Sequence, residues 1–489
     1  MRNLRDAMNS EAKEIAWRYL DRNVAAIAEL ADAIFYFGEL GLEEVETARL
    51  MTELLREGGF YVEKGLSGFP TAFLATSGEA GPVVAVHTEY DANPDNSQVP
   101  GIAEKREIVA GAPGHCEGHN VNAAVMVATA LAVRHAQTAA RLPGRLKVFG
   151  APAEEMILAR PYFVRDGHFD DVDIAFHPHI YDRFSTEYGQ IQIAAYSVEF
   201  TFFGESAHAG TSPWAGRDAL DAVVLMDAGF AQHREHMRPE MRAHRVITNG
   251  GAQPNVIPDR ASIWWYFRDR TADGARALFQ TAKRIADGAA LMTGTRVEVD
   301  VRSAVWPVRA NQTLAELLQR NIAAVGMPTW SGEEDALARR IQQSAGVPVD
   351  GLRRKTTPLG GPSKPIMASN DCGDISWKVP MGRLWFPGNV PGLTFHHWSA
   401  GAALATSISH KGALAGAKAL AGAVLDCLED PELIQQARRT HVTEVAGVSY
   451  EPLLPSMQVP RLDTNRAVMD RFRPLMQQHY RKKRPRFEN

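Results

Sequence analysis

The sequence predicts an α/β protein in which a largely parallel sheet, with helices on both faces, is interrupted by a smaller α+β domain. Short apolar segments at 71–76, 82–87, 145–150 and 172–176 alternate with helical patterns, which is typical of βαβ units. From about residue 191 the pattern changes to longer alternating strands with two helices among them. That change indicates an inserted domain of the ferredoxin-like type.

The length of 489 residues also favours more than one domain, because a single hydrophobic core rarely grows so large. We expect the first part of a catalytic metal-binding domain at 1–190 and an inserted dimerisation and substrate-lid domain at 191–304. The second part of the catalytic domain follows at 305–435. A polar C-terminal extension is expected at 436–489, and its basic end is interpreted as a solvated terminus.

Individual elements follow from local periodicity. Apolar residues at helical spacing predict helices over 11–36, 43–57, 122–134, 218–233, 272–292 and 405–428. Alternating apolar and polar residues predict strands of the insert over 191–203, 261–268 and 296–301.

Composition excludes several classes of partner. Charged residues make up 22% of the chain and the net charge is −4, so we expect neither nucleic acid nor a membrane as a partner. Three scattered cysteines, Cys116, Cys372 and Cys427, predict no disulfide framework and favour a reducing compartment. Without a signal-like start or an apolar run of about 18 residues, the protein is expected to be soluble and cytoplasmic.

A metal site is predicted at the loop 114–120, where His115, Cys116, Glu117 and His119 lie within five positions. Imidazole and carboxylate groups are ligands of zinc, cobalt and manganese. The loop lies between a predicted strand and a predicted buried helix, so its side chains can converge on one point.

Further polar side chains follow the ends of other predicted strands: His87, Glu154, Glu155, His177 and His179. Side chains just past the carboxyl ends of parallel strands form the site in such sheets. A metal hydrolase needs one carboxylate to bind the ion and a free one to move a proton between water and the leaving amine. Adjacent glutamates can divide these tasks.

Motifs along most of the chain resemble the M20 metallopeptidase and amidohydrolase superfamily, in the branch that contains the B chain of p-aminobenzoyl-glutamate hydrolase. The matching segments, in chain order, are 89–92, 113–120, 153–155, 170–173 with His179, 206–209, 213–222, 247–251, 254–258, 368–377, 396–398 and 409–412.

The resemblance implies a role for each matching residue. Glu154 is expected to be the general base and Glu155 a metal ligand, with His119, His179 and His396 as further ligands. From the insert, His208, Asn255 and Arg268 are expected to contact the substrate, and His208 does so across a homodimer. Asp371, Asp374 and Lys411 are expected to brace the site loops.

Two departures from the family pattern affect the metal shell. Glu117 stands where the branch has a metal-bridging cysteine, and Cys116 is displaced by one position. His87, with Glu89 to orient it, resembles a ligand of the peptidase members. The expected ligands are therefore His87, Glu117, His119, Glu155, His179 and His396, around one or two ions of Mn²⁺ or Zn²⁺, or else Co²⁺.

These expectations predict a metal-dependent amidohydrolase that cleaves an amide between an acyl or aryl-acyl group and an amino acid or related amine. Two alternatives stay open. One is a hydrolytic deaminase or amidase of an unusual small aromatic molecule, and the other is a weakly catalytic binding or regulatory subunit.

Overall fold

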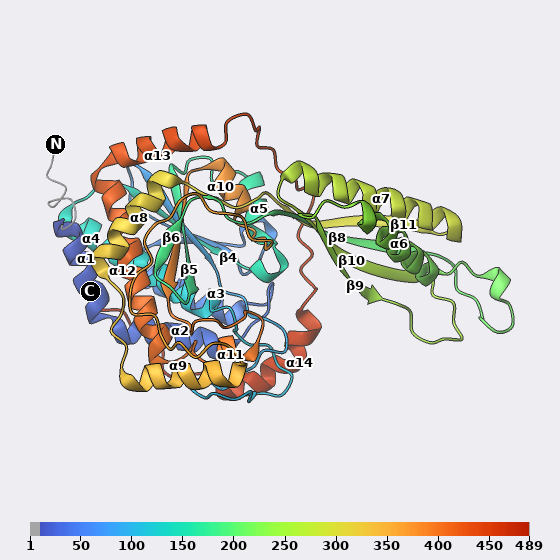
Figure 1. Cartoon of the computed structure of the whole chain (residues 1–489), viewed down its shortest axis with the longest axis horizontal. Helices are drawn as coiled ribbons and strands as arrows, with labels where there is room; N and C mark the ends of the chain where they lie inside the picture. The colour runs from blue at the N-terminus through green and yellow to red at the C-terminus, as the bar shows by residue number, and fades with distance from the viewer. Residues whose placement is uncertain (1–9, 489) are drawn as a thin grey trace.

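The computed structural model describes residues 10–488 and contains a large mixed sheet and a small antiparallel one (Figure 1). The large sheet has seven strands in the order β1-β2-β4-β3-β5-β13-β6. Its strands are β1 (Tyr61–Lys64), β2 (Phe73–Ser77), β3 (Val83–Glu89), β4 (Arg145–Ala151), β5 (Ile174–Tyr181), β6 (Ser185–Glu187) and β13 (Met381–Pro387). The four central strands are mutually parallel and the outer three are antiparallel to their neighbours, so the predicted, largely parallel sheet is confirmed.

Successive side chains of the buried strands point to opposite faces of the sheet, so both faces are apolar and both are covered by helices. On β3, Val84 and Val86 belong to one core, and Val83 and Ala85 to the other. The first core includes residues of α1 (Glu11–Arg22), α2 (Val24–Phe37), α3 (Val45–Glu57), α4 (His119–Ala140), α8 (Gln312–Val325), α12 (Ser407–Glu429) and α13 (Pro431–Glu444). The second includes residues of α5 (Ala159–Arg165) and α10 (Gly373–Lys378).

The single helix predicted over 11–36 is two helices, α1 and α2, separated by Asn23. The backbone of Asn23 leaves the helical region, with φ −99° and ψ 17°, and its side-chain amide donates to the carbonyl oxygens of Tyr19 and Glu488. An asparagine that bonds the backbone in this way competes with the helix ladder. The prediction of one uninterrupted helix was therefore wrong.

The small sheet belongs to a separate domain of β8 (Ala194–Phe203), α6 (Ala219–His233), β9 (Arg242–Asn249), β10 (Arg260–Asp269), α7 (Ala272–Thr293) and β11 (Arg296–Val305). Its strand order, β11-β8-β10-β9, and its two helices give the predicted ferredoxin-like arrangement. Sequence periodicity did not predict β9, since this edge strand is largely exposed and has no apolar face. Figure 1 shows the domain extending away from the large sheet.

The remaining helices are α9 (Gly332–Ala345), α11 (Trp398–Gly401) and α14 (Arg466–Met476), and β7 (Gly189–Gln190) pairs with β12 (Arg309–Ala310). Within residues 10–488 no helix combines the length and apolarity needed to cross a membrane.

The segment after α13 contacts both domains. Tyr450 donates its hydroxyl to Asp374 at 2.9 Å, whereas Arg461 pairs with Glu199 of β8 at 2.5 Å. Near the end of the chain, Arg484 pairs with Glu57 of α3 at 2.6 Å. The basic end of the chain therefore packs on the first helices. The sequence had led us to expect a solvated terminus and did not predict these ion pairs. The division at 190, 304 and 435 is kept as our proposal for the units of this chain.

Candidate metal centre

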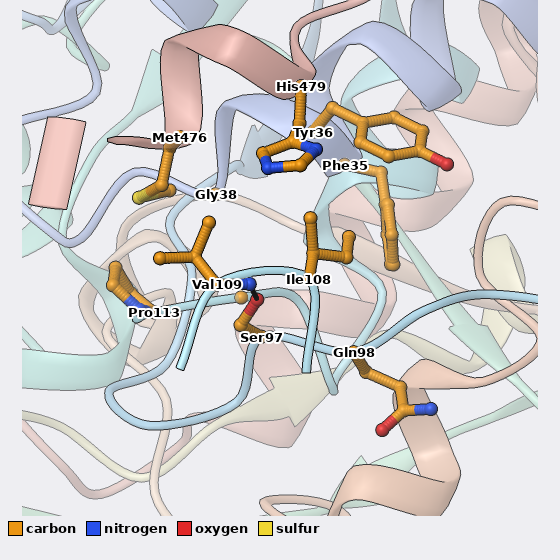
Figure 2. Close-up of a pocket in the computed structure, with 11 residues that line it drawn as sticks. Phe35, Tyr36, Gly38, Ser97, Gln98, Ile108, Val109, Pro113, Met476 and His479 are labelled. Atoms are coloured by element: carbon orange, nitrogen blue, oxygen red, sulfur yellow. Dashed lines mark hydrogen bonds between the residues drawn. The ribbon is translucent and has the colours of Figure 1, made fainter. Parts of the chain in front are cut away.

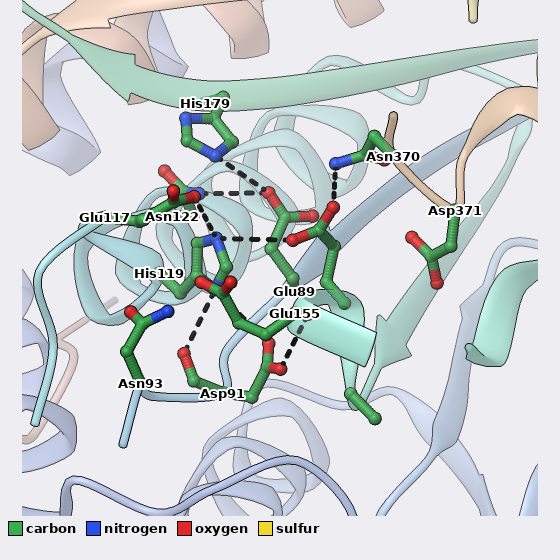
Figure 3. A network of polar contacts seen from close by, with 12 residues as sticks. Glu89, Asp91, Asn93, Glu117, His119, Asn122, Glu155, His179, Asn370 and Asp371 are labelled. Atoms are coloured by element: carbon green, nitrogen blue, oxygen red, sulfur yellow. Dashed lines mark hydrogen bonds and ion pairs between the residues drawn. The ribbon is translucent and has the colours of Figure 1, made fainter. Parts of the chain in front are cut away.

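Acidic and imidazole side chains gather at the carboxyl ends of the parallel strands (Figure 3). Glu89 ends β3, Glu154 lies three residues after the end of β4, and His179 lies near the end of β5. The loop before α4 adds Glu117, and α4 itself begins with His119. Two groups have ligand atoms within 4.8 Å of one another, Glu117-His119-Glu154-Glu155 and Glu89-His119-His179.

His119 is common to both groups and is almost completely buried. Its Nδ1 lies 3.0 Å from the carbonyl oxygen and 3.2 Å from the carboxylate of Asp91, so we assign the proton to Nδ1. Nε2 has no hydrogen-bond partner within the described chain. Although burial opposes it, the hydrogen bonds and charges of the surrounding carboxylates raise the pKa of His119 well above its usual value, so a metal would take the place of a proton on Nε2. Nε2 lies 3.6 Å from Glu117 Oε2 and 3.9 Å from Glu154 Oε2. A buried imidazole oriented by a carboxylate, with its other nitrogen unpartnered, fits a metal ligand.

Glu117 and Glu155 meet His396 at the rim of the centre. His396 Nε2 lies 2.6 Å from Glu117 Oε1 and 3.3 Å from Glu155 Oε2. Burial, and then the nearby charge of Glu117, raise the pKa of Glu155 to about 8. The Oε1 atom of Glu155 is buried without a hydrogen-bond partner among residues 10–488. This crowding of carboxylates favours a bound cation.

The backbone at the centre adopts uncommon conformations. His396 has a φ of +62°, and Ala153 and Ile157, on either side of the Glu154–Met156 turn, have φ values of +58° and +49°. Such left-handed conformations of residues other than glycine cost about 1–3 kcal/mol each and concentrate at functional sites. Here they position His396 and the two glutamates.

His179 is oriented as a further ligand. Its Nδ1 lies 2.8 Å from the carbonyl oxygen of Ile180, which places the proton there and leaves Nε2 free. Nε2 is 3.4 Å from Glu89 Oε1. Burial lowers the pKa of His179 to about 4, so the imidazole is neutral at pH 7, as ligation requires.

The predicted ligand His87 is not brought to this centre. Its fully buried ring lies 4.8 Å from the ring of His177, and neither ring nitrogen has a partner in the described part of the chain. His87 is two residues before Glu89 on β3, so it lies on the same face about 7 Å further from the strand end. Glu89 contacts His177 Nε2 at 2.8 Å, Asn122 and Arg160, but not His87.

Glu154 is held by a residue that the sequence did not single out. Its Oε1 accepts a hydrogen bond of 2.5 Å from the side-chain amide of Asn370, whose own Oδ1 accepts from the backbone N–H of Cys372. Burial, and then the charge of Glu155, raise the pKa of Glu154 well above its usual value. A carboxylate with a raised pKa can accept and return a proton near neutral pH.

Asp91 is a second residue whose role the sequence did not reveal. Besides orienting His119, its Oδ2 accepts from the backbone N–H of Glu155 at 3.0 Å. Both Asp91 and Asn370 lie inside the segments 89–92 and 368–377 that matched the family. The family motifs therefore indicated the correct segments of the sequence. The structure was needed to show which residue in each segment contacts the metal centre.

The predicted substrate contacts divide into two kinds. Arg268 on β10 lines a cavity of about 620 Å³ together with Glu117, Glu154, Glu155, His179 and His396, and its Nε is buried without a partner in the described structure. His208 and Asn255 lie on adjoining loops of the small domain, where Ala209 N–H donates to the Asn255 carbonyl, and neither lines this cavity. One chain alone does not bring these two residues to the centre.

A second hollow lies between α2 and α14 (Figure 2) and measures about 20 Å³. Phe35, Ile108, Val109 and Met476 are among its lining residues. It has room for a water molecule but not for a substrate, so we assign no function to it.

Comparisons with known proteins show which sequences and folds this chain resembles. The model of "Peptidase family M20/M25/M40" matches residues 85–348. The chain is 31% identical over 476 residues to the B chain of p-aminobenzoyl-glutamate hydrolase from Escherichia coli (strain K12), covering 91% of this chain and 98% of that protein. It is 28% identical to indole-3-acetyl-aspartic acid hydrolase of Enterobacter agglomerans, over 65% and 77% of the two chains.

Among solved structures, a putative aminohydrolase from methicillin-resistant Staphylococcus aureus superposes with a TM-score of 0.59 at 19% identity, covering 85% of this chain and all of that one. The aminobenzoyl-glutamate utilization protein from Klebsiella pneumoniae gives 0.58 at 17% identity, covering 83% and 97%. At these identities the superpositions show the shared fold.

The geometry predicts that substitution of Glu155 lowers the metal content of the protein, whereas substitution of Cys116 does not. Glu155→Gln is expected to weaken metal binding at least about ten-fold, because an amide is a poorer ligand than a carboxylate. Cys116→Ser serves as the control, since its buried thiol donates to Asn93 Oδ1 at 3.0 Å. Elemental analysis of both purified variants after dialysis against Mn²⁺ or Zn²⁺ measures the effect.

The opposite pattern would contradict this assignment. If Cys116→Ser loses the metal while Glu117→Gln retains it, the cysteine is the ligand and the loop has been interpreted in the wrong register.

Proposed function

The chain belongs to peptidase family M20/M25/M40, and from that premise we propose that it is a metal-dependent amidohydrolase. It would cleave an amide between an acyl or aryl-acyl group and an amino acid or a related amine. The main support is the convergence of Glu117, Glu154 and Glu155 on the unpartnered Nε2 of His119, inside a cavity that Arg268 also lines.

We propose that Glu117, His119, Glu155, His179 and His396 bind the metal. Because His119 belongs to both groups of candidate ligands, the arrangement is compatible with one ion or with two neighbouring ions. Nitrogen and oxygen ligands without a thiolate favour Mn²⁺ or Zn²⁺, with Co²⁺ as a third choice. A bound divalent ion would act as a Lewis acid toward water and the scissile carbonyl.

Glu154 is the proposed general base. Asn370 fixes one carboxylate oxygen, and the side chain faces the cavity. Glu154 takes a proton from the attacking water and returns it to the nitrogen of the leaving amine. Arg268, whose Nε is unpartnered in the described structure, is placed to bind a carboxylate or carbonyl oxygen of the substrate.

The two alternatives predict different observations. A deaminase or amidase of a small aromatic molecule would release ammonia, whereas the proposed reaction releases an amino acid or a larger amine. A binding or regulatory subunit needs neither a general base nor metal, and the retention of both glutamates at the centre argues against it.

We further propose that the protein is a homodimer and acts in the cytoplasm. The edge strand β9 exposes Val246 and Ile247, and Trp214 of the same domain is 77% exposed. An unpaired strand edge with exposed apolar side chains is suited to pairing with a second copy. The three cysteines are buried and unpaired, which is compatible with a reducing compartment.

The general-base assignment predicts that Glu154→Gln will lower kcat by about 10²–10⁴-fold while metal content and fold are kept. The amide can still accept the hydrogen bond from Asn370 but cannot transfer protons. The control is Glu298→Gln, an exposed carboxylate on β11. Steady-state hydrolysis of an N-acyl amino acid measures the effect, and a Glu154→Gln enzyme within a few-fold of the parent would refute the assignment.

The dimer proposal predicts complementation between two inactive chains. If His208 completes the site of the partner subunit, mixing His208→Ala chains with Glu154→Gln chains creates one site with both intact residues. Activity should then rise by at least about ten-fold over either variant alone. Verified mixed dimers without any recovery would show that each site is built within one chain.

A further inference from the structure

Beyond the candidate ligands, the cavity continues along three aromatic rings, Tyr181, Trp385 and Phe395, which we call the aromatic wall. The Tyr181 ring centre lies 5.4 Å from that of Trp385 and 5.8 Å from that of Phe395. The wall begins beside the metal centre, because the His179 ring lies 5.4 Å from Trp385 and 6.3 Å from Phe395. A group attached to the carbonyl that reacts there would therefore lie against these rings.

Cationic side chains also line this cavity. The Arg183 guanidinium lies 4.7 Å from the centre of the Tyr181 ring. Its Nε is 3.9 Å from the carboxylate of Asp182, which Arg353 engages more closely, at 2.9 Å. Lys364 also lines the cavity, is exposed, and makes no ion pair that the described structure shows. Besides the glutamates of the metal centre, Glu187 is the acidic residue that lines the cavity, and its carboxylate accepts from Trp385 Nε1 at 2.6 Å and from the Ser363 hydroxyl at 3.0 Å.

These contacts disfavour a cationic ligand. Aromatic side chains attract cations through their faces, but Arg183 lies over Tyr181 and the buried Arg383 lies over Trp385 at 4.3 Å. A positively charged substituent would meet three cationic side chains, Arg183, Arg383 and Lys364, against the single carboxylate that Glu187 offers outside the metal centre. An anionic substituent would instead be attracted to them.

We infer that this part of the cavity is an acyl-binding subsite for an aromatic ring with an anionic substituent at the end away from the amide. The ring would pack against the aromatic wall in offset or edge-to-face contacts. The anion would lie near Arg183 and Lys364. This inference depends on the proposed amidohydrolase function and adds the chemical class of the acyl group.

The test uses the wild-type enzyme and four amides of one amino acid: N-acetyl, N-benzoyl, N-(4-carboxybenzoyl) and N-(4-amidinobenzoyl). We expect kcat/KM for the benzoyl compound to exceed that for the acetyl compound at least about ten-fold, from burial of the ring. We expect a further preference of about ten-fold for the carboxybenzoyl over the amidinobenzoyl compound. Equal rates for acetyl and benzoyl, or a preference for the cation, would overturn the inference.

Variants separate the contributions of the wall and the cations. Trp385→Leu should lower the benzoyl-to-acetyl ratio about ten-fold, and Arg183→Glu should invert the preference between the carboxylate and the amidine. The control Arg354→Glu reverses the charge of an exposed arginine that does not line the cavity, and it should leave both ratios unchanged. Unchanged ratios in folded Trp385→Leu and Arg183→Glu enzymes would refute the assigned roles.

A binding measurement keeps the inference separate from the proposed function. Benzene-1,4-dicarboxylate should bind the wild-type protein at least about ten-fold more tightly than benzoate in calorimetric titrations. If no amide is cleaved with Mn²⁺, Zn²⁺ or Co²⁺ but this difference is found, the proposed function fails and the subsite stands. If amides are cleaved without the aromatic and anionic preferences and the two acids bind alike, only the subsite fails.

Discussion

The repulsion among buried carboxylates around His119 is the constraint on which the proposed site depends. Glu117, Glu154 and Glu155 present oxygen atoms within 4.8 Å of one another and of the imidazole. Burial first, and then the charge of a neighbouring carboxylate, raise the pKa values of Glu154 and Glu155, whereas the pKa of Glu117 is lowered, despite its burial, by its contacts with the imidazoles of His119 and His396. A divalent ion would relieve the repulsion among the carboxylates and would replace a proton on Nε2 of His119 at the same time.

Two layers of buried polar side chains hold these groups in place. Asp91 contacts both His119 and the backbone of Glu155, so one side chain orients two candidate ligands. A deeper layer is built on Arg160, which is fully buried and pairs with Glu89 and Asp371. Buried ion pairs contribute little net stability, because removing charges from water is costly. Their main effect here is to fix positions, which agrees with the bracing role expected for Asp371.

The sequence predicted those parts of the fold and site that depend on local pattern. Buried apolar runs such as 82–87 predicted the parallel strands, and the meeting of strand ends brought Glu155 and His179 to the predicted place. β9 was missed because an exposed edge strand has no apolar periodicity. The residue pattern could not tell which side chain of β3 reaches the carboxyl end of the strand. In the structure Glu89 is at that end, whereas His87 lies two residues earlier and contacts the ring of His177. Neither His208 nor Asn255 lines the cavity of its own chain, and their proposed roles would need a second copy, which one sequence does not specify.

The most direct test of the proposed centre is a crystal structure of the Mn²⁺-loaded protein with anomalous diffraction data. Our account predicts anomalous density between His119 Nε2, Glu117 and Glu155, with His179 or His396 completing the coordination. Density beside the Cys116 thiol or beside the His87 ring, with Glu117 turned away from the ion, would contradict it.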